Sequence, residues 1–253
     1  MISIIRNKKN YQKAVVVLFW LVVWQLASIG IGHSLLLVSP IEVAKTLVIL
    51  IAEPSFWSTI GFSFVRIVSG FLLAIFVGIL LAAVSAKSNI IKELLAPFLG
   101  VIKSIPVVSF IILVLIWFGS ESLSIIISFL MVLPIIYTNV LEGIERTDRH
   151  LLEMAKVFHI TPFKVLKYIY IHSTMPFFLS ACKIGLGLCW KSGIAAEVIG
   201  LPTGSIGERL YQSKIFLSTA ELFSWTIVIV VISFLFERFF LWVLSRVEKG
   251  LIA

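Results

Sequence analysis

One long, nearly uncharged stretch limits what the chain can fold into. From Trp57 to Val84 there is a single charged side chain, Arg66. A helix needs only about 20 apolar residues to cross the hydrocarbon core of a membrane. Composition supports the same class, because 60% hydrophobic residues, 13% charged residues and a mean hydropathy of +1.10 exceed what a soluble domain of this length needs. The sequence therefore predicts an all-α polytopic membrane protein.

Breaks between the apolar runs predict six transmembrane helices in one domain over residues 1–253. Basic residues then orient the chain, since 13 of the 21 fall in segments that we place in the cytoplasm and three (Lys45, Arg209 and Lys214) fall outside. Both termini are therefore expected in the cytoplasm, the first of them held by Arg6, Lys8, Lys9 and Lys13. The expected spans cover about 14–31, 57–84, 101–118, 123–140, 177–199 and 222–244.

Two segments outside this simple pattern carry proline. Ser39 can cap a helix that starts at Pro40 and has an apolar stripe at Val43, Leu47 and Leu50. This helix, over 40–52, is too short to span, so we expect it along the outer membrane face. Pro97 and Pro106 each predict a kink or break before the third span.

The polar segment 144–176 is the longest interruption in the second half of the chain. Thr147 or Asp148 can cap a first helix, and Thr161 with Pro162 can start a second. The pattern predicts a helix, a tight turn and a helix. Such a hairpin either rests on the inner leaflet or binds a partner.

Two stripes of small residues recur every four positions in the second and fifth spans. They predict close packing of helices in lipid. Their members are Gly70, Ala74, Gly78, Ala82, Ala181, Gly185, Cys189 and Gly193.

Extending the stripes outward reaches Arg66 on one helix and Glu197 on the other. A pair between them avoids two isolated charges in the membrane. Each could instead reach the outer headgroups separately, and a pair could be structural or part of a gate. Lys191 lies deeper and is either a cation of a translocation pathway, a partner of another buried acid, or a water-exposed residue with no role in transport.

A family resemblance rests on several ordered motifs. The segment LLEMAKVFHITPFKVLKYIYIHSTMP resembles the cytoplasmic EAA loop of ATP-binding-cassette (ABC) importer permeases, with Glu153, Met154 and Ala155 as the triplet and Met175 and Pro176 at its end. His159 stands where that family has glycine. The segments LVSPIEV, RIVSGFLLAIFVGILLA, KSIPVVSF and GLCWKSGIAAEVIG are similar to the nitrate, sulfonate, taurine and thiamine-precursor branch.

The resemblance implies that this EAA-like loop (144–176) binds a separate ATPase subunit. The expected contacts are Glu153, Ala155, Lys156, His159, Ile160, Thr161, Pro162 and Phe163. The sequence contains no G-x-x-x-x-G-K-[ST] motif, so ATP and Mg²⁺ are expected in that partner and no cofactor or metal in this chain. The residues expected at the pathway or gate are Arg66, Ser104, Pro106, Trp190, Lys191 and Glu197.

The resemblance further implies an assembly of two permease copies, two ATPases and an extracytoplasmic binding protein. We expect a homodimer of permeases, with the binding protein on the outer helix and on residues 203–214. The expected function is import of a small anionic or heterocyclic solute. The alternatives are an ATP-independent secondary carrier and a membrane-embedded enzyme, although the single Asp148 and four scattered histidines form no catalytic cluster in the sequence.

Overall fold

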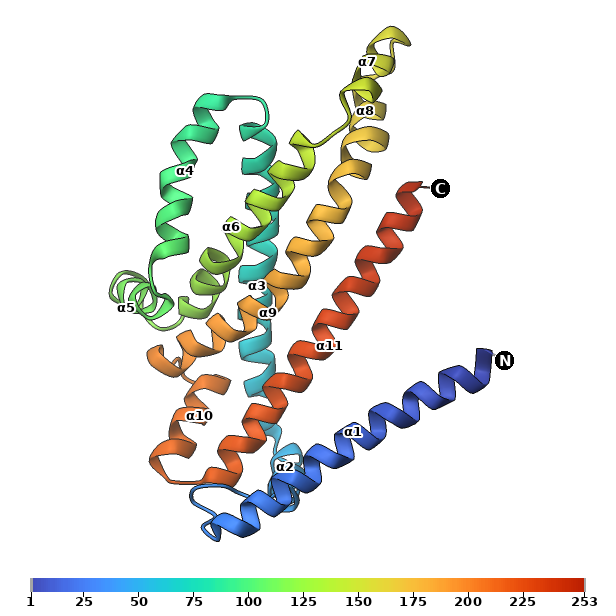
Figure 1. Cartoon of the computed structure of the whole chain (residues 1–253). Coiled ribbons are helices and arrows are strands. Elements are labelled where there is room, and N and C mark those ends of the chain that lie inside the picture. Colours follow the sequence, from blue (N-terminus) through green and yellow to red (C-terminus); the bar gives the residue numbers. More distant parts are fainter. Residues whose placement is uncertain (1, 253) are drawn as a thin grey trace. The chain divides into compact units, whose positions relative to one another are not determined.

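The structure, a computed structural model, describes the backbone of residues 2–252 and the side chains of 12, 15–246 and 250. All regular elements in this part of the chain are helical, which confirms the predicted fold class. The basic side chains of Arg6, Lys8, Lys9 and Lys13 lie outside the described residues. Figure 1 shows the elements in chain order: α1 (Ile2–Ile31), α2 (Pro40–Ile51), α3 (Pro54–Ser85), α4 (Asn89–Ser104), α5 (Val107–Phe118), α6 (Leu123–Glu145), α7 (Arg149–Val157), α8 (Pro162–Val165), the π-helical turn η1 (Leu166–Tyr170), α9 (Ile171–Gly200), α10 (Ile206–Ile215) and α11 (Thr219–Ile252).

Three described helices are long and apolar enough to cross a membrane, namely α3, α6 and α11. A fourth span results if α4 and α5 count as one bent segment. The apolar part of α1, Val15–Ile31, is shorter, and α9 is long but not among the apolar helices. The chain is therefore a polytopic membrane protein, while the count of six spans and the orientation of the termini stay predictions.

The predicted third span, 101–118, is wrong as a single segment. α4 and α5 meet at an angle of 106°. The break falls at Pro106, which has no amide hydrogen and favours an extended residue before it, and Ile105 has ψ 132°. Pro97, by contrast, lies inside α4 without ending it. The carbonyl that loses its donor there belongs to Glu93, an exposed residue, so solvent can satisfy it.

Contacts within the chain gather in two compact units. Unit 1 comprises Met1–Ser58 and Arg209–Val228, and unit 2 comprises Thr59–Glu208 and Ile229–Ala253. The boundaries fall inside the continuous helices α3, α10 and α11. One domain over 1–253 therefore stays a prediction.

In unit 1 the aromatic side chains form the centre of the packing. Trp225 is buried with its ring 5.1 Å from that of Phe56, centroid to centroid. Trp24 donates its indole hydrogen to the carbonyl of Val38 at 2.9 Å, which fastens the chain after α1. Buried aromatic pairs stabilise a structure by about 0.5–1.5 kcal/mol beyond their area.

The short helix predicted over 40–52 forms, while its place along the outer membrane face stays a prediction. Pro40 is the first residue of α2, and the Ser39 hydroxyl accepts a hydrogen bond from the amide of Glu42 at 3.2 Å. Val43 and Leu50 are buried, as the apolar stripe predicted. The other side of α2 is exposed although it is also apolar, at Ile41, Val48 and Ile49.

In unit 2, α6 is the most enclosed of the apolar spans, with 61% of its central window buried. The α3 stripe packs on it, because a side chain at Gly70 would collide with the carbonyl of Ile125, and one at Gly78 would lie 2.8 Å from Ile136. The predicted close approach is confirmed, and α6 is the helix that receives this stripe.

The α9 stripe packs on α6 as well. Gly185 faces Val132, and the Ser128 hydroxyl donates to the carbonyl of Cys189 at 3.2 Å. A side chain at Gly193 would lie 2.7 Å from both Ile67 of α3 and Ser128. These contacts fix the register between α6 and α9 within unit 2.

Candidate functional site

The first arm of the EAA-like loop is α7, whose start was predicted correctly. Asp148 is the N-cap, and its Oδ1 accepts a hydrogen bond from the amide of His150 at 2.8 Å. This cap satisfies one of the amides that a helix leaves free at its first turn.

The turn after α7 has the left-handed geometry that helix ends often use. His159 has φ +51°, its amide donates to Lys156 at 3.1 Å, and the amide of Ile160 donates to the carbonyl of Ala155 at 2.9 Å. These two bonds form a Schellman motif, in which glycine is the usual residue at the left-handed position. A histidine holds that position in this chain.

The second arm starts at Pro162 with Thr161 as N-cap, as predicted. It does not stop before the fifth span. α8 continues through η1 into α9, so helical backbone extends from Pro162 to Gly200, and Pro176 lies inside α9. A π-helical turn is rare and often marks a functional position.

The tip of this loop exposes apolar side chains. Val157, Phe158 and Phe163 are 74%, 72% and 74% exposed, whereas Ala155 is buried. Glu153 keeps 72% of its side chain exposed and lies 4.0 Å from His150. Of the other expected contacts, Ile160 is half-buried and the following are exposed: Lys156, His159, Thr161 and Pro162.

The predicted pair between Arg66 and Glu197 is wrong. The guanidinium of Arg66 binds the carboxylate of Glu121 at 2.6 Å and also donates to the Glu121 main-chain carbonyl. Glu121 lies in the turn between α5 and α6, beside the N-terminal half of α3, and so reaches Arg66 first.

Glu197 is fully buried and joins α9 to two other elements of unit 2. Its Oε2 accepts hydrogen bonds from the Ser63 hydroxyl at 2.7 Å and from the Gly207 amide at 3.3 Å. Ser63 in turn accepts from the amide of Ile206 at 2.9 Å. The carboxylate thus sits at the N-terminus of α10, where free amides and the helix dipole favour a negative charge.

The other residues expected at the pathway or gate lie partly in the core and partly on the surface. Trp190 is buried beside Phe64 and Phe236, at 6.0 Å and 6.5 Å between ring centroids. Ser104 and Pro106 are exposed at the break between α4 and α5, and Lys191 is exposed on α9. Trp190 and Glu197 therefore belong to the packing of unit 2 and not to its surface.

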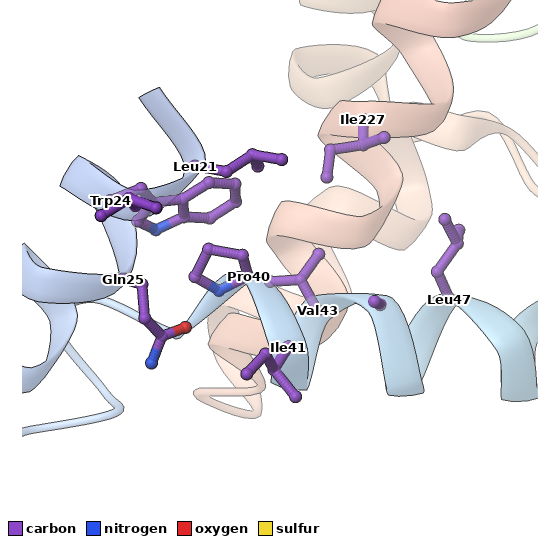
Figure 2. A pocket seen from close by; sticks show the side chains of 10 residues that line it. Leu21, Trp24, Gln25, Pro40, Ile41, Val43, Leu47 and Ile227 are labelled. Atoms are coloured by element: carbon purple, nitrogen blue, oxygen red, sulfur yellow. The ribbon is translucent and has the colours of Figure 1, made fainter. Parts of the chain in front are cut away.

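A pocket of about 490 Å³ lies in unit 1 between α1, α2 and the start of α11. Figure 2 shows Leu21, Trp24 and Gln25 of α1 facing Pro40 and Ile41 of α2. Its lining contains no charged residue. This pocket is therefore not suited to hold an anionic solute.

Comparison with known proteins identifies the family. The model of the binding-protein-dependent transport system inner membrane component matches residues 74–251, which is more than half of the chain. The chain belongs to this family. It is thus a multi-pass component of the inner membrane, and the predicted membership among ABC importer permeases is confirmed.

Curated relatives are named as permeases of several solutes. SsuC of Escherichia coli (strain K12), an aliphatic sulfonates transport permease protein by name, is 31% identical and the match covers 78% of this chain and 75% of SsuC. The taurine transport system permease protein TauC of the same organism is 25% identical over 88% of this chain and 82% of TauC. The formylaminopyrimidine transport permease protein ThiX of Halalkalibacterium halodurans is 26% identical over 78% of this chain and 80% of ThiX.

Among solved structures, the inward-facing MetNI methionine ABC transporter has a similar fold. The TM-score is 0.56, with 18% identity, 77% of this chain covered and 93% of that chain. At this identity the likeness concerns the fold alone.

Two residues of this ABC permease were missed in the sequence. Glu121 binds the guanidinium of Arg66, and Ser63 binds the carboxylate of Glu197. Glu121 is an acid in the short turn between two apolar helices, and that signal could have marked it as a partner. Ser63 carries no such signal, because serine is common in spans and usually bonds to its own helix.

Proposed function

We propose that this permease forms half of a translocation pathway and couples it to ATP hydrolysis in a separate ATPase subunit through the EAA-like loop. The observation that carries the proposal is the apolar tip of that loop, formed by Val157, Phe158 and Phe163, which nothing in the described chain covers. Exposed apolar patches rimmed by polar residues are typical of protein interfaces. The expected contacts are those named from the sequence, with Ala155 shaping the helix beneath the tip.

The backbone supports transmission from this loop to the membrane. Helical structure is continuous from Pro162 of the loop to Gly200 at the end of α9. A displacement of the tip by a closing ATPase therefore moves α9 directly through η1. Ser104, Pro106 and Lys191 are exposed and remain pathway candidates.

The proposed assembly contains two copies of this chain, two ATPases that hold ATP and Mg²⁺, and an extracytoplasmic binding protein. The exposed apolar side of α2, at Ile41, Val48 and Ile49, supports a docking role for the outer helix. The loop over 203–214 contains α10 and offers a second docking surface. Both termini and the EAA-like loop then lie in the cytoplasm.

The proposed solute is a small anion or a small heterocycle. The names of SsuC and TauC indicate sulfonates, and that of ThiX indicates a formylaminopyrimidine. Family membership also favours an ABC permease over the alternatives, a secondary carrier or a membrane enzyme, since the family's members are binding-protein-dependent transport components.

The test is copurification of the ATPase subunit with permease variants from membranes. Ala155→Arg places a charge at the buried position of α7, and Glu153→Lys reverses an exposed charge beside it. We expect Glu153→Lys to lose about 90% of the bound ATPase, because an interfacial charge reversal costs on the order of 2 kcal/mol. Ala155→Arg should lose at least as much, because an arginine at this buried position displaces the helix beneath the tip. Lys164→Glu, an exposed charge reversal in α8, is the matched control and should retain the ATPase.

Equal ATPase recovery with all three variants would contradict the proposal. The amount of permease in the membrane is measured alongside, so that a loss of insertion is not read as a loss of binding.

A further inference from the structure

Two lysines share one exposed face of α9. Lys183 and Lys191 are eight residues apart, about 12 Å along the helix at about 1.5 Å per residue. Gly187 lies between them on the same face, and a side chain there would meet nothing within 4 Å. The surface between the two lysines is therefore open in the described chain.

Both lysines lie at the depth of a membrane span. Gly185, two residues from Lys183, packs against Val132 in the middle of α6. Cys189, two residues from Lys191, accepts the hydrogen bond from Ser128 in the outer part of α6. Since α6 is long and apolar enough to cross the membrane, Lys183 lies near its centre and not at the headgroups.

Neither lysine forms an ion pair with a described residue, whereas two basic residues of α3 and α4 do. Arg66 binds Glu121 at 2.6 Å, and Lys92 binds Glu145 at 2.5 Å. An unpaired lysine facing lipid at the centre of a span costs about 2.5–3.5 kcal/mol on insertion scales. This cost disappears if the face of α9 with the two lysines contacts water. In agreement with this, α9 is not among the described helices that are long and apolar enough to cross a membrane.

We propose that this face of α9 lines the water-filled pathway and that Lys183 and Lys191 are two successive binding positions for a small anion. The proposal rests on the proposed function. Of the two solute classes named there, a small anion and a small heterocycle, it favours the anion. Two positive charges without acidic partners attract a negative solute and leave a heterocycle without charge unaffected. Gly187 keeps the passage between the two positions free of side-chain atoms.

The test measures the reaction of a cysteine at position 187 with two water-soluble methanethiosulfonates, one carrying a sulfonate and one a quaternary ammonium. The native cysteines, Cys182 and Cys189, are buried and are replaced by alanine. In the assembled complex in membrane vesicles, Gly187→Cys should react with both reagents and about tenfold faster with the anionic one. Phe76→Cys, on the exposed apolar face of α3, is the control and should react with neither.

Adding Lys183→Gln or Lys191→Gln to Gly187→Cys should each lower the anionic preference, and both together should abolish it. A cysteine at position 187 that reacts as slowly as the one at position 76 would overturn the water-filled face. Rapid reaction without a charge preference would overturn the anion positions. If the proposed coupling to the ATPase is wrong, the copurification assay shows it, and the reaction rates of the cysteine at position 187 stay as predicted.

Discussion

The two ends of α9 differ in how they are completed. At the C-terminal end, Glu197 binds Ser63 and Gly207, and Gly207 has no room for a side chain against Glu197. At the other end, α9 continues through η1 into a loop whose apolar tip is exposed. The C-terminal end is closed by this chain alone, whereas the loop end exposes an apolar surface that we propose a partner covers. Substitutions should therefore affect stability at the first and assembly at the second.

The largest effect on stability is expected from Glu197→Leu. Leucine leaves the Ser63 hydroxyl and the Gly207 amide buried without an acceptor, at about 1–3 kcal/mol each. We expect a clear fall in the thermal midpoint of the purified permease and faster proteolysis between residues 201 and 208. Glu197→Gln keeps an oxygen acceptor and should retain most of the stability.

Glu121→Gln is the comparison for an ion pair at the surface. Its carboxylate is 63% exposed, so the pair with Arg66 contributes only about 0–1 kcal/mol. A midpoint for Glu121→Gln as low as that of Glu197→Leu would contradict the distinction between a buried clamp and a surface pair.

At the loop end, an effect confined to the turn is expected from His159. At φ +51°, glycine fits without strain, so His159→Gly should leave the thermal midpoint unchanged. His159→Val puts a β-branched residue in that conformation, at a cost of about 1–3 kcal/mol that falls on the turn. We expect faster amide exchange in α7 for the valine variant, with the global midpoint unchanged. A global midpoint that falls as far as in Glu197→Leu would show that the loop is part of the core.

Local signals in the sequence predicted much of this fold. The caps at Ser39, Asp148 and Thr161 were predicted correctly because capping depends on a few neighbouring residues. The small-residue stripes were also found, since they follow helical period and size.

Tertiary choices were not predictable in the same way. Helical periodicity shows which face of α3 carries Arg66, but it does not show which acid lies opposite that face. The acid is Glu121, which lies in a turn whose position depends on the bend at Pro106. Pro97 and Pro106 differ in the residue whose carbonyl loses its donor, which is the exposed Glu93 for Pro97 and the buried Ile102 for Pro106. The exposed face with Lys183 required the register between α9 and α6, which the sequence does not contain.

The central claim is that the tip of the EAA-like loop is covered by the ATPase. The most direct measurement is maleimide labelling of Phe158→Cys, in the background without native cysteines, with and without the ATPase subunit in the same membranes. Leu217→Cys, exposed in the loop between α10 and α11, reports on general accessibility. The claim predicts at least about tenfold slower labelling of position 158 when the ATPase is present, and no change at position 217. Equal labelling of position 158 with and without the ATPase would contradict it.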